Sequence, residues 1–273
     1  MKIDLKLTNS PKAKPTDESK LGFGAVFSDH MLIRKWTLEG GWEDAEIVPY
    51  ADFVLSPAAA VFHYGAEIFE GLKAYRTAEG KVQLFRPIEN VRRMNNSAER
   101  LCMPQMPEEE MLECIKKIVE VEKDWVPHSE GTSLYIRPFL IGTDPKLGVH
   151  TVHQCTFCII CSPSGSYYAE GLAPVKIMIE DEDVRAVRGG TGYAKCGGNY
   201  DPSVRNLLFT KPPKLFIAGH SHILKVKYDK TLDLLHLNPG AASMQGWHKE
   251  RTLMRLVIDG ATFKDLEVIT LAD

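Results

Sequence analysis

The sequence predicts an α+β fold, because its helical and strand patterns occur in separate blocks instead of alternating regularly. Apolar residues recur at helical spacing over residues 88–103 and again over 106–125. The stretches "SLYIRPFLIG" and "CTFCIIC" have the composition of strands, and the patterns after residue 210 are short strands without a long helix. We therefore expect an N-terminal α+β domain followed by a mostly β C-terminal region.

The composition excludes several classes of protein. A chain of 273 residues can bury a core and form one large or two smaller domains. A net charge of -3 provides no basic surface, so we expect no nucleic-acid partner. The apolar runs are interrupted by polar residues, and the first residues lack the apolar core of a signal peptide. We expect a cytoplasmic chain that does not cross a membrane.

The first part of the chain contains two predicted helices. Residues 1–20 are polar and are expected to form a poorly anchored arm, and "KVQLFRP" reads as a strand that ends at its proline. In the first helix the inward positions are Ile88, Val91, Met94, Ala98 and Leu101. Pro107 opens the second helix, whose inner face consists of Met111, Ile115, Ile118 and Val119.

Three cysteines are spaced as Cys155-x2-Cys158-x2-Cys161, a spacing that also occurs in zinc and iron–sulfur sites. Their segment reads as a buried strand, however, and three residues at this spacing do not share one face of a strand. Buried, reduced thiols are the better interpretation.

The domain boundaries follow from composition. We expect an N-terminal domain over residues 21–161 and an interdomain linker over 162–174, which is rich in Ser, Gly and Pro. Short strands are predicted after the linker at 175–180, 214–219, 223–228, 232–238, 253–260 and 266–271.

Five glycines surround one lysine, Lys195, in "GGTGYAKCGGNY". Glycines allow the backbone to approach a ligand closely, and a lysine held in a partly desolvated loop can act as an amine nucleophile towards a carbonyl such as that of pyridoxal phosphate. The alternative from the residues alone is a glycine-rich surface turn with a solvated lysine.

Four long motifs weigh against that alternative: "VFHYGAEIFEGLKAYR" (61–76), "LFRPIENVRRMNNSAERLCMP" (84–104), "LYIRPFLIG" (134–142) and "RAVRGGTGYAKCGGNY" (185–200). From about residue 20 to Tyr200 the chain resembles the branched-chain amino acid aminotransferases, which are pyridoxal-phosphate enzymes of fold type IV. The resemblance implies pyridoxal 5'-phosphate as cofactor, amino transfer from Leu, Ile or Val to 2-oxoglutarate, and a homodimer.

The resemblance also assigns residues to roles. Lys195 corresponds to the Schiff-base lysine and proton shuttle, Tyr200 to the tyrosine that binds the phenolic oxygen of the cofactor, and Arg93 to the arginine that binds its phosphate. The positions that correspond to the substrate pocket are Tyr64, Phe69, Gly71, Tyr135, Arg137 and Tyr167. Taken by themselves, Arg93 also fits a solvated helix residue, Arg137 half of a surface ion pair, and the aromatic residues an ordinary core.

The resemblance stops at Tyr200, and residues 201–273 have a different character. A transaminase needs a carboxylate opposite the pyridine nitrogen. Asp229 and Asp233 lie at about the right distance in sequence after the lysine, but they read as charges of a hairpin turn and an exposed face. "KLFIAGHSHILKVKYDKTLDLLHLNPGAAS" resembles the C-terminal end of calcineurin-like metallophosphoesterases of the small phosphodiesterase type. There His220 and His222 correspond to two ligands of a two-metal centre for a divalent metal such as manganese. Two histidines at this spacing are also often incidental, and the other ligands of such a centre are absent upstream.

These observations predict a composite chain, a chimera joined at about residues 200/201. In it, residues 175–200 begin a cofactor domain that is not completed, and the C-terminal region is an incomplete metallophosphoesterase-like fragment. We accordingly expect weak or no transaminase activity, and no phosphodiesterase activity.

Overall fold

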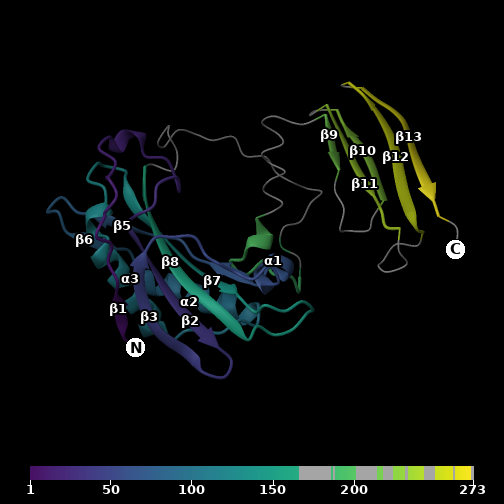
Figure 1. Cartoon of the computed structure of the whole chain (residues 1–273). Coiled ribbons are helices and arrows are strands. Elements are labelled where there is room, and N and C mark those ends of the chain that lie inside the picture. Colours follow the sequence, from purple (N-terminus) through teal and green to yellow (C-terminus); the bar gives the residue numbers. More distant parts are fainter. Residues whose placement is uncertain are drawn as a thin grey trace. The chain divides into compact units, whose positions relative to one another are not determined.

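The computed structural model describes residues 1–165, 186, 188–200, 214–217, 224–230, 233–242, 250–260 and 262–271 (Figure 1). The chain divides into two compact units, Met1–Tyr200 and Asp201–Asp273. The division coincides with the end of the aminotransferase-like motifs at Tyr200. The helices are α1 (Ala60–Tyr64), α2 (Pro87–Arg100) and α3 (Glu108–Val121), with short 3-10 turns at Glu18–Lys20, Lys123–Trp125 and Gly197–Asn199.

One mixed sheet forms the framework of the N-terminal unit. Its strands are β1 (Ile3–Leu5), β2 (His30–Thr37), β3 (Gly41–Pro49), β4 (Glu67–Phe69), β5 (Leu72–Arg76), β6 (Val82–Leu84), β7 (Ser133–Gly142) and β8 (Gln154–Ser164). Their order is β1-β3-β2-β8-β7-β5-β6, and β4 pairs with β7. The pairing is antiparallel throughout this sheet except between β1 and β3. The α+β class predicted from the sequence agrees with this architecture.

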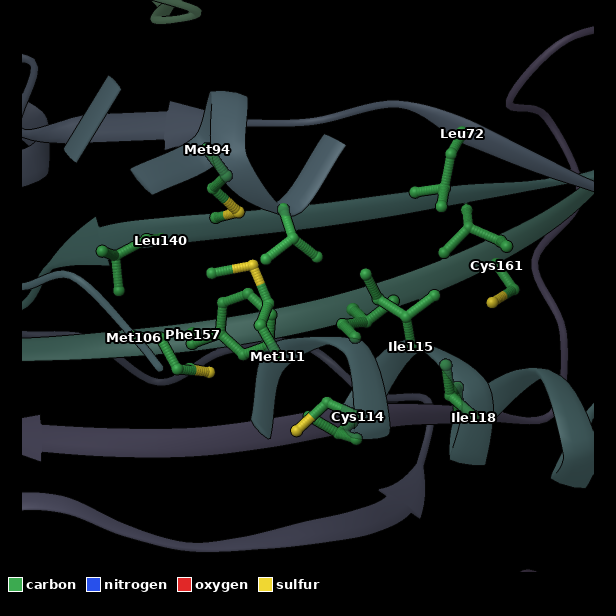
Figure 2. Packing of buried hydrophobic residues seen from close by; sticks show 14 of the residues in the cluster. Leu72, Met94, Met106, Met111, Cys114, Ile115, Ile118, Leu140, Phe157 and Cys161 are labelled. Atoms are coloured by element: carbon green, nitrogen blue, oxygen red, sulfur yellow. The ribbon is translucent and has the colours of Figure 1, made fainter. Parts of the chain in front are cut away.

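Helices α2 and α3 cover the sheet and enclose the core with it (Figure 1). Figure 2 shows Met94 of α2 and Met111, Ile115 and Ile118 of α3 among the strand residues Leu140 and Phe157. The inner faces predicted from helical spacing are confirmed: Val91, Met94, Ala98, Met111, Ile115, Ile118 and Val119 are buried, and Ile88 and Leu101 pack against the cluster while partly exposed. Among the described residues, no helix combines the length and the apolar character needed to cross a membrane.

The N-terminal arm is anchored, contrary to the expectation from its polar composition. Strand β1 pairs with β3, and the backbone N–H of Thr8 donates to Nε2 of His30 at 2.9 Å. Because Nε2 accepts this bond, the imidazole proton is on Nδ1, which lies 2.5 Å from Oε1 of the buried Glu122. The prediction was wrong because backbone hydrogen bonds, which do not depend on side-chain polarity, hold the segment.

Two predicted boundaries also differ from the structure. Strand β8 continues through Ser162 to Ser164, the first residues of the expected linker, because Ser133 and Tyr135 of β7 pair with Ser164 and Ser162. Pairing with a long neighbouring strand thus outweighs the Ser/Pro composition of the segment. The lysine loop belongs to the N-terminal unit, whereas the sequence suggested that a second domain begins before it.

The C-terminal unit consists of strands in the part that the structure describes. They are β9 (Leu215–Ile217), β10 (Leu224–Asp229), β11 (Leu234–Pro239), β12 (Thr252–Asp259) and β13 (Thr262–Thr270), and they form a three-stranded and a two-stranded sheet. Each lies at a predicted strand. Asp233 lies in the β10–β11 turn with φ 52°, where its exposed carboxylate contacts Lys214 and the Tyr228 hydroxyl. The predicted strand at 175–180 lies outside the described residues.

The cysteines behave as buried thiols. Cys155 and Cys161 of β8 belong to the core cluster, while Cys158 points to the other face of the strand, so the three do not converge on one metal. All six cysteines are unpaired, and all except Cys102 are buried. Burial raises the pKa of the Cys114 and Cys155 thiols to about 12, and it also raises the pKa values of Cys158 and Cys161.

We predict that the native chain has one rapidly reacting thiol, Cys102, because thiolate formation requires access to water. Titration with a thiol-specific chromogenic reagent should give one fast equivalent in the native protein and six after denaturation. Cys102→Ser should remove the fast phase. A second fast thiol in that variant would contradict the burial of the other five.

Glu18 provides a pH-dependent contact between the N-terminal segment and the turn before β7. Its carboxylate accepts the backbone N–H groups of His128, at 2.9 Å, and Ser129, at 2.6 Å. Burial acts to raise the pKa of Glu18, but the hydrogen bonds from Ser129 and His128 outweigh it and hold the pKa at about 2.

We predict that the ionised Glu18 stabilises the fold above pH 4.5, its ordinary pKa, and that this contribution is lost as the pH falls towards about 2. Glu18→Gln should lower the free energy of unfolding by roughly 1 kcal/mol at neutral pH. Urea denaturation at several pH values should show the difference between the two proteins shrinking below pH 4.5. A difference that does not change with pH would disprove the ionic role.

Candidate functional site

The backbone of Lys195 is fixed from two directions. Its N–H donates to Oγ of Ser97 in α2 at 2.8 Å, and its carbonyl accepts the N–H of Phe69 at the end of β4 at 3.0 Å. Ser97 is fully buried, so water does not compete for this hydrogen bond. The backbone of Lys195 is therefore held between a helix and a strand.

The loop that carries Lys195 closes around a buried amide. The side-chain amide of Asn199 donates to the carbonyls of Thr191, at 2.8 Å, and Ala194, at 2.7 Å. Gly197 passes so close to Glu67 that an added Cβ would clash with Oε1 of that carboxylate. A larger residue at position 197 would require the Glu67 side chain to move.

The amine of Lys195 lies beside two aromatic rings. Nζ donates to the Tyr200 hydroxyl at 2.6 Å and lies 4.6 Å from the ring centroid of Phe69. The centroids of Phe69 and Tyr200 are 5.2 Å apart. The 3-10 turn Gly197–Asn199 brings Lys195 and Tyr200 together although five positions separate them. The two predicted cofactor residues form one amine–phenol pair.

The outward face of β7 adds two predicted residues to this group. Along the strand Leu134, Ile136 and Leu140 are buried, while Tyr135 and Arg137 alternate with them and face the other way. Arg137 Nη2 donates to the Tyr135 hydroxyl at 2.9 Å, and the guanidinium carbon lies 4.6 Å from the Phe69 centroid. Nε of Arg137 is buried and has no hydrogen-bond partner among the described residues.

Gly71 allows Tyr135 to take this position. A Cβ at Gly71 would clash with the Tyr135 hydroxyl oxygen, so a larger residue would displace the ring. Gly71 therefore contributes space to the site and no chemistry of its own.

Arg93 is held by a buried carboxylate. Its Nε and Nη2 donate to Oε1 and Oε2 of Glu70 at 2.5 and 2.7 Å, and Glu70 raises the pKa of the guanidinium. Half of the arginine side chain is nevertheless exposed. Arg93 is thus a half-exposed helix residue whose guanidinium is paired with a buried carboxylate. Arg93 lies one helical turn before Ser97, whose hydroxyl donates to the Arg93 carbonyl at 3.1 Å.

The structure does not bring every predicted residue together. Tyr64 is exposed on α1, where its hydroxyl accepts the N–H of Gly148 at 2.5 Å, and no hydrogen bond or ring contact joins it to the Lys195 group within the described residues. Tyr167, His220 and His222 lie outside the described residues. The described part of the chain contains no cluster of three or more potential metal ligands.

Three contributing residues were not singled out from the sequence: Phe23, Glu70 and Ser97. The Phe23 ring packs edge-on against Tyr135, with centroids 4.8 Å apart. Glu70 and Ser97 lie inside the quoted motifs, but an isolated glutamate or serine does not indicate its partner. The glycines beside Phe23 in "GFGAVF" were the signal available for that residue.

A separate groove of about 920 Å³ lies between β6, the start of α2, and α3. Val82, Leu84, Ile88 and Leu112 line it, and none of the predicted site residues does. The volume of this groove therefore does not identify it as the functional site, because its lining lacks the reactive groups that converge near Lys195.

Comparison with known proteins gives sequence relatives that include branched-chain amino acid aminotransferases. Branched-chain-amino-acid aminotransferase 2 of Bacillus subtilis is 52% identical over 203 residues, which are 74% of this chain and 56% of the relative. Branched-chain-amino-acid transaminase 1 of Bacillus subtilis is 53% identical over 195 residues, 71% of this chain and 54% of the relative. The mitochondrial branched-chain-amino-acid aminotransferase of Mus musculus is 45% identical over 203 residues, 74% of this chain and 52% of the relative. No family model matches the chain.

Among solved structures, a T.th. branched-chain amino acid aminotransferase complexed with N-(5'-phosphopyridoxyl)-L-glutamate matches 65% of this chain and 54% of that chain. The identity is 28% and the TM-score 0.47. The sequence similarity extends over about three quarters of the chain. The chain spans about half the length of the curated relatives it matches. These relatives give no support to a metallophosphoesterase fragment or to a composite origin.

We predict that Ser97→Ala destabilises the protein by about 1–3 kcal/mol, because the N–H of Lys195 would lose its buried acceptor. The matched control is Ser133→Ala, since Ser133 is equally buried but its hydroxyl has no hydrogen-bond partner among the described residues. The control should change the free energy of unfolding little. Equal destabilisation of both variants in chemical denaturation would show that the Lys195 contact contributes nothing specific.

Proposed function

We propose that this chain carries the lysine-bearing part of a pyridoxal-phosphate-dependent branched-chain amino acid aminotransferase site. The observation that carries the proposal is the convergence of the Lys195–Tyr200 pair, Arg93 and Arg137, within a chain that is 52% identical to such an enzyme over 203 residues. The activity of the whole enzyme belongs to proteins about twice the length of the matched region, so it remains part of this proposal.

The chemistry of the described residues fits pyridoxal phosphate. Lys195 provides a primary amine, Tyr200 a phenol that can bond an aromatic hydroxyl or oxide, and Arg93 a guanidinium with an exposed end for a phosphate. The Phe69 and Tyr200 rings beside the amine provide apolar surface for an aromatic ring. A divalent metal has no comparable donor set in the part of the chain that is described.

When bound, pyridoxal phosphate supplies an aldehyde carbon and an aromatic system that withdraws electrons from the carbon of an attached amine. Lys195 supplies the nitrogen nucleophile and, as a neutral amine, a base for the substrate Cα proton. Tyr200 lies 2.6 Å from Nζ, so its hydroxyl can accept a hydrogen bond from the ammonium form or donate one to the neutral amine. The hydrogen bond between Nζ of Lys195 and the Tyr200 hydroxyl thus fixes the position of the amine that accepts the substrate proton.

Arg137 is the best candidate for binding the carboxylate that amino acids and 2-oxo acids share. Its guanidinium lies over the Phe69 ring, and its buried Nε has no other partner among the described residues. The rings of Phe23, Phe69 and Tyr135 are suited to an aliphatic side chain such as that of leucine. Tyr64 and Tyr167 remain proposed members of this pocket, and a homodimer remains part of the proposal.

We expect turnover to be weak or absent. No motif after Tyr200 assigns a carboxylate to the pyridine nitrogen. Of the described acidic residues near the site, Glu70 is paired with Arg93 and Glu67 lies against Gly197. The C-terminal interpretation, with His220 and His222 as remnants of a metal site, rests on sequence resemblance alone and is the second candidate.

We predict that purified protein mixed with pyridoxal phosphate acquires the visible absorbance of the aldehyde condensed with a lysine amine. Lys195→Ala should abolish most of this absorbance, because Lys195 is the amine held beside Tyr200. The matched control is Lys81→Ala, which removes an exposed lysine of the β5–β6 hairpin. The control should retain the signal.

Retention of the signal in Lys195→Ala would disprove the assignment of the lysine. Rapid turnover of leucine with 2-oxoglutarate would disprove the expectation of weak activity while supporting the family assignment. Manganese-dependent hydrolysis of an aryl phosphodiester that is lost in His220→Ala would favour the second candidate.

A further inference from the structure

Glu70 is the most completely hydrogen-bonded carboxylate around the site. It is about 1% exposed and its carboxylate accepts hydrogen bonds from three residues. Arg93 donates two of these bonds, Nδ2 of Asn90 donates one at 3.0 Å, and the N–H of Gly71 donates one at 3.1 Å. A buried carboxylate with this many donors is fixed in place, because any movement of the carboxylate would leave several buried polar groups without a hydrogen-bond partner.

Glu70 occupies one particular edge of the Arg93 guanidinium. It accepts from Nε and Nη2, which form the side-on edge of the planar group. Nη1 makes no hydrogen bond within the described residues, and half of the side chain is exposed. The pair therefore leaves the Nη1 end of the guanidinium directed away from Glu70 and available to another oxyanion.

The position of Arg93 relative to the amine depends on the same residues. Glu70 follows Phe69, whose N–H binds the Lys195 carbonyl, and Arg93 precedes Ser97, whose hydroxyl binds the Lys195 N–H. The hydroxyl groups of Tyr200 and Tyr135 are near enough to contribute to the raised pKa of Arg93. The free end of Arg93 and the amine of Lys195 thus belong to one hydrogen-bonded framework.

We infer that Glu70 is a positioning residue that orients Arg93 for the phosphate group of the ligand bound by Lys195. This inference rests on the proposed function and deepens it. Glu70 does not act as a competitor for Arg93 that a phosphate displaces, because Asn90 and Gly71 hold its second oxygen independently of the arginine.

The test compares pyridoxal phosphate with pyridoxal, which carries the same aldehyde but no phosphate. Each is titrated into the full chain, and the absorbance of the condensed aldehyde is followed. In Glu70→Gln we expect the affinity for pyridoxal phosphate to fall by about tenfold or more, because an amide cannot accept hydrogen bonds from both Nε and Nη2 of Arg93 and no longer aligns the guanidinium. The affinity for pyridoxal should change by less than about threefold, since the Lys195 contacts remain.

The matched control is Glu89→Gln. It removes the same charge from the neighbouring part of α2, where Glu89 is exposed and pairs with Arg92 at 3.3 Å. This variant should bind pyridoxal phosphate as tightly as the wild type or slightly more tightly, because a repelling charge is lost. In an Arg93→Gln background, Glu70→Gln should have no further selective effect.

Asn90→Ala provides a second variant in case Glu70→Gln does not fold. It retains both charges and removes one donor to Glu70, so a smaller loss, still specific to pyridoxal phosphate, is expected. Equal or stronger binding of pyridoxal phosphate by Glu70→Gln, or an equal loss for both aldehydes, would overturn the inference alone. Failure of the wild type to condense with either aldehyde through Lys195 would overturn the proposed function and the inference together.

Discussion

The position of the reactive residues in the N-terminal unit depends on one closed network of hydrogen bonds around Lys195. The hydroxyl of Ser97 and the N–H of Phe69 hold the two backbone groups of the lysine, and the Glu70–Arg93 ion pair joins the end of strand β4 to helix α2 a few residues away. Each link connects segments that are far apart in the sequence, and Ser97 and Glu70 are buried. A low local dielectric strengthens buried hydrogen bonds and raises the free energy lost when one of them is broken. The network therefore fixes both Lys195 and Arg93.

The elements that form this network also form the core. Their periodicity places the core residues on one face and the site residues on another. On α2, Val91, Met94 and Ala98 face the sheet, while Arg93 is exposed on the side next to Glu70. On β7, the residues that alternate with Tyr135 and Arg137 are buried beneath the helices. A helix with a period near 3.6 and a strand with a period of 2 can therefore present reactive groups on one side without interrupting the packing on the other.

The C-terminal strands do not separate apolar and polar residues in this way. In β10 the apolar residues Leu224, Val226 and Tyr228 are exposed, and the charged residues between them are less so. An alternating strand normally buries its apolar side, so β10 lacks the covering layer that β7 has among the described residues.

The sequence by itself determined the elements with strong periodicity and the residues with distinctive chemistry. Helices α2 and α3, strands β7 and β8, and the C-terminal hairpins lie where their apolar patterns predicted them, and the glycines around Lys195 identified the loop. The anchoring of residues 1–20, the extension of β8 to Ser164 and the contributions of Phe23, Glu70 and Ser97 were decided only by the tertiary structure. The physical reason is that periodicity is a local property, whereas a backbone hydrogen bond or a buried carboxylate acquires its partner from a distant segment of the chain.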